Sequence, residues 1–238
     1  MTQFELAVQD PQGLQVAKAV GADRMELVEA LSTGGVTPSA GFIEVAVATG
    51  VPVHALVRPR EGSFEYDADE KRTILADVRH AVALGAAGVV IGGLVDGIVD
   101  LGLVRAVRET AGTAEVTFHR AFDQLADKES AVDQLADAGV TRVLTSGGKA
   151  AAGDALDTLR ALVSRSSGRV QIMAGGGVTS ATAAAVAETG VDAVHASAKR
   201  AVTEQLAVSL GSGAAAGDSV RFTNDVDEAR AVLAALAR

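Results

Sequence analysis

Apolar and polar positions follow one repeated pattern along most of this chain. A segment rich in alanine and valine, with the spacing typical of a helix, ends at a glycine, and a short β-branched run follows within a few residues. Glycine suits the position just after a helix because the backbone there often turns left-handed. The glycines recur about every 28 residues, which is the size of a βα unit. They are Gly21, Gly50, Gly85, Gly112, Gly139, Gly168 and Gly190.

This pattern predicts alternating strands and helices. The expected strands are Phe4–Val8, Arg24–Val28, Pro52–Arg58, Gly88–Gly92, Glu115–His119, Arg142–Ser146, Val170–Ala174 and Asp192–His195. The expected helices are Gln12–Val20, Pro38–Thr49, Asp69–Leu84, Asp100–Thr110, Lys128–Ala138, Asp154–Arg165, Ser180–Thr189 and Asp227–Ala237. Pro38 and the acidic residues that open several of these segments are typical of first helical turns.

Alternating strands and helices are compatible with an open doubly wound sheet or with a closed barrel. Even spacing, eight units and a length of 238 residues favour the barrel. No Gly-x-Gly-x-x-Gly turn follows the first strand, which disfavours a dinucleotide-binding sheet. We therefore predict an α/β fold, a single (β/α)8 TIM-barrel domain over residues 1–238. Gly211–Asp218, rich in glycine, alanine and serine, is expected to be a flexible surface loop before the last helix.

Composition narrows the classes of partner and the compartment. The net charge of −9 disfavours nucleic acid as a partner, because an acidic surface repels phosphate backbones. The chain contains no cysteine, which excludes disulfides, thiolate nucleophiles and thiolate metal sites. The first residues do not resemble a signal peptide, and no apolar stretch is long enough to span a membrane. These features predict a soluble, cytoplasmic protein.

Ionisable residues gather where the predicted strands end. Val116–Asp123 begins as an apolar run and closes with an imidazole, a guanidinium and a carboxylate within five residues. In barrels of this kind the functional face lies at the carboxyl ends of the strands. Because side chains alternate along a strand, Glu26 shares a face with Val28, and His54 shares one with Leu56 and Arg58. If these faces point inward, the barrel mouth holds a carboxylate, imidazoles and guanidinium groups together.

Two sets of candidate residues follow from this arrangement. The acid–base candidates are Glu26, His54, His119 and Asp123. The anion-binding candidates are Arg58, Arg60, Arg120, Ser146, Gly147, Gly175, Gly176 and Gly177, with Lys149 or Arg200 nearby. The glycine turns are included because exposed amides at a helix start suit a phosphate or carboxylate. Structural roles stay open: a strand histidine can be a hydrogen-bonded core residue, Glu26 a buried ion-pair partner, and the glycines a tight turn.

Several segments in order resemble the CutC family of copper homeostasis proteins. They are Gly21–Leu27, Gly34–Ser39, Arg58–Arg60, Thr117–Asp123, Leu144–Gly147 and Ala174–Gly177, and they cover roughly the first 200 residues. The resemblance implies a (β/α)8 barrel, a cytoplasmic location, self-association as a homo-oligomer, and the handling of copper. One departure concerns cysteine: relatives often carry it after the Glu-Leu pair, where this chain has Val28, and near the end of the first strand, where it has Ala7-Val8.

Without thiolates, a tight Cu(I) site is hard to build from three scattered methionines. A site of histidines and a carboxylate would suit Cu(II) or zinc better, with Glu26, His54, His119 and His195 as ligands. The first hypothesis is therefore a copper-binding homeostasis protein. The alternative is an enzyme that acts on a small anionic metabolite, for example a phosphorylated one, by general acid–base chemistry. A binding module without chemistry is a third class, and no membrane or nucleic-acid partner is expected.

Overall fold

The computed structural model describes residues 2–208 and 217–236, and within them eight parallel strands close into a barrel. The order around the ring is β1-β10-β9-β8-β7-β4-β3-β2. The strands are β1 (Gln3–Val8), β2 (Arg24–Leu27), β3 (Val53–Leu56), β4 (Gly88–Ile91), β7 (Glu115–Phe118), β8 (Arg142–Thr145), β9 (Gln171–Gly175) and β10 (Ala193–Ala196). The predicted TIM barrel is therefore confirmed.

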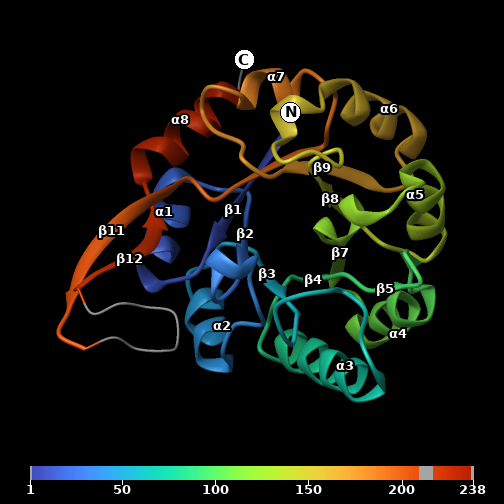
Figure 1. Cartoon of the computed structure of the whole chain (residues 1–238), viewed down its shortest axis with the longest axis horizontal. Helices are drawn as coiled ribbons and strands as arrows, with labels where there is room; N and C mark the ends of the chain where they lie inside the picture. Colours follow the sequence, from blue (N-terminus) through green and yellow to red (C-terminus); the bar gives the residue numbers. More distant parts are fainter. Residues whose placement is uncertain (1, 209–216, 237–238) are drawn as a thin grey trace.

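The helices lie around the outside of the ring (Figure 1). They are α1 (Pro11–Val20), α2 (Ala40–Val47), α3 (Ala68–Ala83), α4 (Leu101–Ala111), α5 (Lys128–Asp137), α6 (Leu156–Ser166), α7 (Ala183–Ala187) and α8 (Val226–Leu236). Three short 3-10 helices follow strands or precede helices: η1 (Leu31–Thr33), η2 (Arg120–Gln124) and η3 (Ala152–Asp154). The glycines that were expected after helices all have positive φ, as at Gly21 (70°) and Gly190 (89°).

Local sequence explains where most helices begin. The Asp10 carboxylate accepts a hydrogen bond from the Gly13 amide at the start of α1. At α3, Asp67 and Glu70 form a reciprocal capping box. α2 and α7 are shorter than predicted, and Asp154 closes η3 instead of opening α6.

Alternation along the strands separates two apolar regions. Outward side chains such as Met25 and Leu27 pack beneath the helices in the main core. Inward side chains form smaller clusters, one of which contains Val28, Leu56 and Val90. The predicted shared face of Glu26 with Val28, and of His54 with Leu56, thus points into the barrel. The remaining interior is polar.

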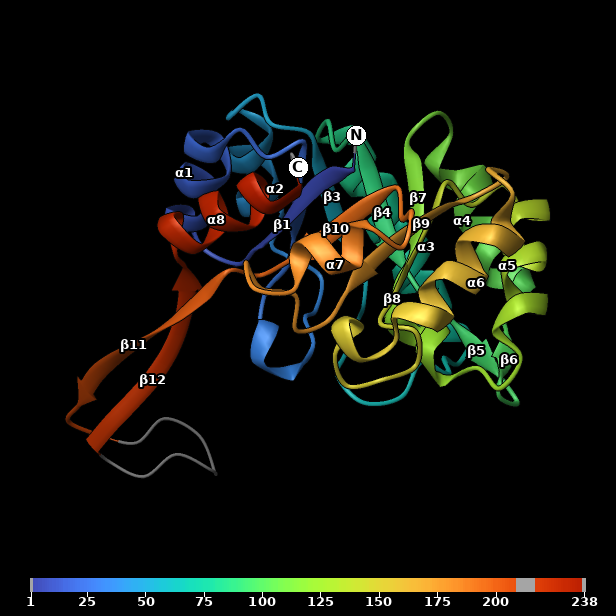
Figure 2. The same cartoon turned by 90° about the horizontal axis from the view of Figure 1, so that it is seen from above.

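Two hairpins extend the barrel. β5 (Leu94–Val95) and β6 (Ile98–Val99) form a short one before α4. β11 (Lys199–Leu206) and β12 (Gly217–Asn224) form a long antiparallel arm that projects away from the barrel (Figures 1 and 2). Residues 211–216 of the predicted Gly211–Asp218 loop lie outside the described residues, but Gly217 and Asp218 belong to β12, which corrects that part of the prediction.

The Asn224 side chain connects the arm to the barrel. It donates hydrogen bonds to the carbonyls of Ala7 (2.9 Å) and Ser197 (2.6 Å). No helix within residues 2–208 and 217–236 is long and apolar enough to cross a bilayer.

Candidate functional site

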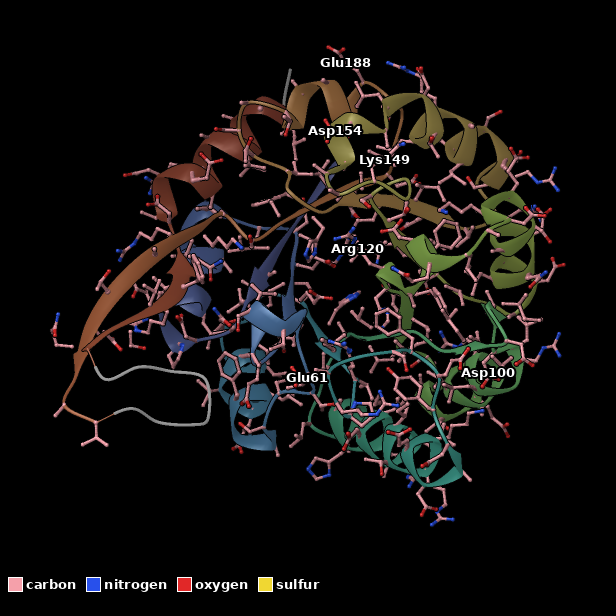
Figure 3. All side chains as sticks on the ribbon, in the orientation of Figure 1. Glu61, Asp100, Arg120, Lys149, Asp154 and Glu188 are labelled. Carbon is pink, nitrogen blue, oxygen red and sulfur yellow. The ribbon has the colours of Figure 1, made fainter. Side chains whose placement is uncertain are left out.

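A cavity of about 460 Å³ opens at the carboxyl ends of the strands. Of the predicted site residues, those that line it are Glu26, Arg58, His119, Arg120, Asp123, Gly176, Gly177 and His195. His54, Arg60, Ser146, Gly147 and Gly175 are not part of its lining. In Figure 3, Arg120 lies near the barrel axis, whereas Glu61, Asp100 and Glu188 lie toward the periphery. The strand ends thus bring together eight of the thirteen predicted site residues.

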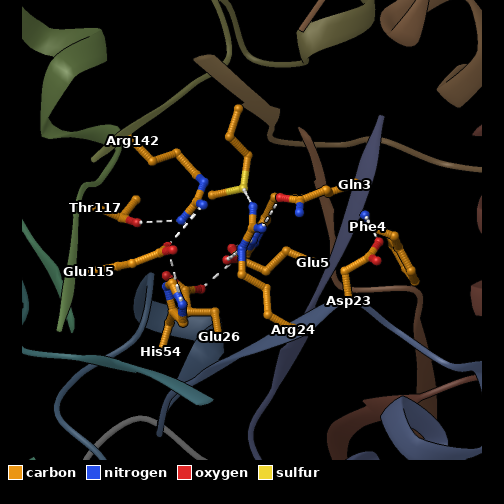
Figure 4. A network of polar contacts seen from close by, with 12 residues as sticks. Gln3, Phe4, Glu5, Asp23, Arg24, Glu26, His54, Glu115, Thr117 and Arg142 are labelled. Carbon is orange, nitrogen blue, oxygen red and sulfur yellow. Dashed lines mark hydrogen bonds and ion pairs between the residues drawn. The ribbon is translucent and has the colours of Figure 1, made fainter. Parts of the chain in front are cut away.

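Strand register places three ionisable side chains side by side below the cavity. Glu5 on β1 pairs with His195 on β10 and with Arg24 on β2. The Glu5 carboxylate contacts His195 Nδ1 and Arg24 Nε, each at 2.7 Å, and the same network continues to Gln3 (Figure 4). Burial alone would raise the pKa of Glu5, but the hydrogen bond with His195 and the charges of His195 and Arg24 lower it. Glu5 is therefore a buried, ionised carboxylate that holds the His195 ring.

Glu26 lies two residues beyond Arg24 on β2, at the wall of the cavity. Its Oε2 is 3.7 Å from His195 Nε2, and no hydrogen bond joins its carboxyl to another described residue. Burial raises the pKa of Glu26 to about 7; the charge of His195 opposes this and that of Glu5 adds to it. Burial would lower the pKa of His195, but Glu26 and Glu5 together raise it. The site therefore pairs an imidazole whose pKa is raised by two carboxylates with a carboxyl whose pKa is raised by burial to about 7.

His54 belongs to a deeper layer of the barrel. Its Nε2 lies 3.7 Å from Glu115 Oε2, and Arg142 contacts the same carboxylate at 3.0 Å (Figure 4). Burial lowers the pKa of His54 to about 4. A Cβ at position 88 would lie 2.8 Å from the His54 ring, so Gly88 is needed to seat it. Its ring lies outside the cavity lining, and its assignment as a catalytic or metal-binding residue stays a prediction.

His119 reaches the cavity from the residue after β7. It caps η2, and its Nδ1 accepts a hydrogen bond from the Ala121 amide at 3.0 Å. Burial, and then the nearby charge of Arg58, lower its pKa to about 3. Its Nε2 is buried and has no hydrogen-bond partner among the described residues.

The arginines expected to bind an anion are largely engaged by the protein itself. Arg58 donates to the carbonyls of Thr33, Gly35 and Gly62 at 2.8 to 3.1 Å. Arg60 lies outside the cavity and pairs with Glu70. Both guanidinium groups hold loops, although Arg58 lines the cavity and its Nε is buried without a partner in the described part of the chain, so a role in binding an anion stays a prediction.

Arg120 differs because its side chain is 41% exposed at the cavity. It contacts Asp123 Oδ2 (2.8 Å) and Ser146 Oγ (2.8 Å), and its guanidinium lies over Gly176. Gly176 and Gly177 have positive φ, and both line the cavity beside it. Gly175 sits beneath Leu144 and His195, so its role is to leave room for them.

The predicted anion cradle at Ser146 and Gly147 is already filled by Asp123. Its carboxylate accepts hydrogen bonds from the Ser146 and Gly148 amides (3.1 and 3.0 Å) and from Thr145 Oγ1 (2.5 Å). The Gly147 amide donates to Thr145 Oγ1 at 2.9 Å. Burial alone would raise the pKa of Asp123, but the hydrogen bonds from Thr145 and Arg120 lower it. Asp123 is thus held as an internal anion at the cavity wall, and its assignment as an acid–base group stays a prediction.

The proposed metal ligands do not meet. No group of three or more histidine, aspartate or glutamate side chains in the described part of the chain is arranged to hold a metal ion. Among the described candidates, Glu26 Oε2 lies 3.7 Å from His195 Nε2, and Glu26 pairs in register with His54 across β2 and β3. His54 faces Glu115 instead, and the His119 Nδ1 lone pair is used by Ala121. With no cysteine in the sequence, these donors do not fit Cu(I), and they form no cluster for Cu(II) or zinc.

Sequence reasoning left three contributors outside the candidate set. The sequence could have indicated Glu5, because it is a charged residue between apolar neighbours in the middle of a strand. Its role, however, depends on the pairing of β1 with β10. Phe64 lies in a loop, and its ring packs 4.9 Å from that of His119. Lys199 lines the cavity from the start of the arm.

Fold and site together define a (β/α)8 barrel with a polar, ionisable cavity at the carboxyl ends of its strands. The CutC family model matches residues 2–200, and the chain belongs to the CutC family. It is 42% identical to a CutC family protein of Rhizobium meliloti (strain 1021) over 200 residues, 83% of this chain and 82% of that protein. A CutC family protein of Bacteroides thetaiotaomicron is 39% identical, over 86% of this chain and 84% of the relative.

Solved structures agree on the fold. The CutC protein of Streptococcus agalactiae, whose name assigns it to copper homeostasis, matches with a TM-score of 0.77 and 31% identity. The match covers 83% of this chain and 99% of that one. An aldolase matches with a TM-score of 0.61 and 16% identity, over 81% of this chain and 89% of the aldolase, and so shares the fold alone.

Proposed function

We propose that this protein binds a small polar molecule in the barrel cavity and transfers a proton to or from it, with Glu26 as the proton-carrying group. The observation that supports this proposal is a buried carboxyl at the cavity wall, 3.7 Å from an imidazole. A carboxyl with a pKa of about 7 is present in both protonation states at neutral pH. General acid–base catalysis is most effective under that condition, typically contributing about 10²- to 10⁴-fold in rate.

His195 and Glu5 support this role by fixing the geometry. Because Nδ1 of His195 faces Glu5, its Nε2 faces Glu26. The imidazolium stabilises the ionised form of Glu26 and limits how far burial raises the pKa. Without it, the pKa of the Glu26 carboxyl would rise further, and a smaller fraction would be ionised to act as a base at neutral pH.

The charge of the cavity favours a ligand with a negative group. Arg120 and Lys199 both line the cavity, and Gly176 and Gly177 lie beside Arg120. This set is smaller than the one predicted from the sequence, because Arg58, Arg60 and the Ser146 amide have internal partners. We infer a small carboxylate or phosphate compound with its anionic group near Arg120.

The family's association with copper homeostasis suggests copper as a ligand, but the donor groups described above do not fit a copper ion. The proposed chemistry therefore uses no metal in the barrel. A protein that retains one equivalent of copper after exhaustive dialysis, and loses it on changing His119 and His195, would contradict this proposal.

The direct test follows the titration of Glu26. Carboxyl ¹³C NMR of labelled protein is expected to show one glutamate that titrates near pH 7 and is missing in Glu26→Gln. Thermal unfolding with glycolate, oxalate, phosphoglycolate and inorganic phosphate then tests the cavity, since a ligand at 100 times its Kd stabilises by about 2.7 kcal/mol. The shift should depend on pH around 7 in the wild type and in Glu188→Gln, an exposed control at the C-cap of α7. A Glu26 that titrates near 4.5 would refute the proposal.

We also propose that the protein works as a cytoplasmic homo-oligomer without nucleic-acid or membrane partners. The net charge of −9 supports the exclusion of nucleic acid. Light scattering on purified protein at several concentrations tests self-association, and a single monomer mass throughout would contradict it.

A further inference from the structure

The hydrogen-bond pattern of His119 fixes which ring nitrogen carries a proton. The Ala121 amide is a donor only, so the Nδ1 atom that it contacts at 3.0 Å must present a lone pair. A neutral imidazole then carries its single hydrogen on Nε2. The ring also caps η2, whose start holds this amide in place.

Packing prevents the ring from adopting another arrangement. A Cβ on Gly92 would lie 2.2 Å from His119 Cε1 and 2.4 Å from Nδ1, so the ring lies flush against the backbone of β4's extension. The Phe64 ring lies 4.9 Å away, between centroids, on a loop that Arg58 holds through Gly62. The nearby Arg58 guanidinium also opposes a second positive charge on the imidazole. His119 is therefore a rigid, neutral hydrogen-bond donor.

The donor itself has no acceptor in the described part of the chain. Nε2 is buried and unpartnered, although His119 lines the cavity. A buried N–H without a partner costs about 1 to 3 kcal/mol, so the group calls for an acceptor. Because His119 lines the cavity, an acceptor atom on a molecule bound there would satisfy this donor.

We propose that His119 donates its Nε2–H to a carbonyl oxygen of the substrate, and that Glu26 removes a proton from the carbon next to that carbonyl. This inference rests on the proposed function and names its substrate class: a small carbonyl compound that carries an acidic C–H. It replaces the roles of base and metal ligand that the sequence suggested for His119.

The proposed step balances without a co-reactant. The Glu26 carboxylate takes the proton, the C–H electron pair forms a carbon–carbon double bond, and the carbonyl π electrons move to oxygen. The resulting oxyanion accepts the hydrogen bond from His119, in the positive field of Arg58. After the Glu26 carboxyl exchanges its proton with solvent, return of a proton from Glu26 to the same carbon, with the oxyanion electrons re-forming the carbonyl, gives hydrogen exchange at that carbon. A fixed donor aimed at a developing oxyanion typically contributes about 10²- to 10³-fold in rate.

Deuterium exchange tests this step. Glycolaldehyde, dihydroxyacetone, dihydroxyacetone phosphate and pyruvate are incubated with the protein in D₂O, and loss of the C–H signal is followed by ¹H NMR. The wild type and Glu188→Gln are expected to accelerate exchange in at least one probe. Glu26→Gln should abolish the acceleration, His119→Met should reduce it by about 10²- to 10³-fold, and His119→Gln, which keeps an N–H donor, should retain more.

A second readout needs no variant. In ¹⁵N-labelled wild type, the His119 ring should show the Nε2–H tautomer from pH 5 to 8, and its Nε2–H signal should shift when the active probe binds. Exchange that persists within threefold in His119→Met overturns this inference and leaves the proposed function standing. If no probe shows either exchange or a shift of the Nε2–H signal, this inference is also overturned. The proposed function is tested separately, by the titration of Glu26.

Discussion

Replacing Glu26 by glutamine should stabilise the protein above neutral pH. Burial raises the pKa of this carboxyl from 4.5 to about 7, so the folded state resists its ionisation. Below pH 4.5 the carboxyl is protonated in both folded and unfolded chains. Between pH 4.5 and 7 the folded chain keeps a proton that the unfolded chain releases, so stability falls as pH rises. Above pH 7 the full cost of the buried charge is present.

The size of the effect follows from the two pKa values. At about 1.4 kcal/mol per pKa unit, the ionised Glu26 costs about 3 kcal/mol. Glutamine has nearly the shape of the protonated acid and does not ionise, so Glu26→Gln avoids this cost. The variant also loses the attraction that helps to raise the pKa of His195, which reduces the gain. About 3 kcal/mol is therefore the upper value at pH 8.

Urea unfolding at pH 4.5, 6 and 8 measures this difference. The free energies of unfolding for wild type and Glu26→Gln should nearly coincide at pH 4.5 and diverge as pH rises, with the variant more stable. Glu188→Gln on the surface should follow the wild type at every pH. A constant offset between Glu26→Gln and wild type across the range would refute the reasoning, because it would show that Glu26 ionises as easily in the folded chain as in the unfolded one.

Three further predictions concern residues that hold the site. Arg58→Lys should lower the free energy of unfolding by about 3 kcal/mol, because lysine cannot form the three hydrogen bonds to carbonyls. It should also speed amide hydrogen exchange around Thr33–Gly35. Unchanged exchange there would contradict this role of Arg58. Asp123→Ala should lower the free energy of unfolding, measured by thermal denaturation, by about 3 to 5 kcal/mol. Acetate should restore part of this loss by binding the Ser146 and Gly148 amides that Asp123 no longer occupies. Equal stabilisation of the wild type by acetate would count against this explanation. Gly92→Ala should displace the His119 ring and lower the free energy of unfolding by about 1 to 3 kcal/mol. The displacement should move the His119 ring signals in NMR spectra. Unchanged signals would show that the backbone moves instead of the ring.

The barrel was predictable because its signals are local. Each helix is followed by a glycine and then by a short β-branched run, and both features can be recognised within a few residues. The even spacing of these units then favours a sheet that closes into a barrel. The long arm of β11 and β12 was not predicted, because it projects from the barrel and its alternation is set by no buried core. Thr203, Glu204 and Gln205, for example, are all exposed, so no apolar face marks the strand.

The site was predictable only as far as strand alternation reaches. Glu26 and His119 line the cavity because inward-facing residues near strand ends must do so. What each group does there depends on partners from other segments. Arg58 is engaged by carbonyls of two loops, and Asp123 folds back from η2 onto the turn after β8. Sequence analysis therefore treats a guanidinium or a backbone amide as free to bind a ligand, even when another segment of the folded chain already binds it.

The barrel interior holds two layers of ionisable groups that differ in their ionic partners. In the lower layer, Arg24 contacts Glu5 at 2.7 Å and Arg142 contacts Glu115 at 3.0 Å, so opposite charges compensate each other there. In the upper layer, within residues 2–208 and 217–236, the nearest ionic partner of the Glu26 carboxyl is His195 at 3.7 Å, and His119 Nε2 has no hydrogen-bond partner. Folding alone gives no reason to keep a buried acid and a buried donor in this state, since apolar side chains would fill the same space at lower cost. Their retention at the open end of the barrel is best explained by a molecule that accepts a hydrogen bond from one and exchanges a proton with the other.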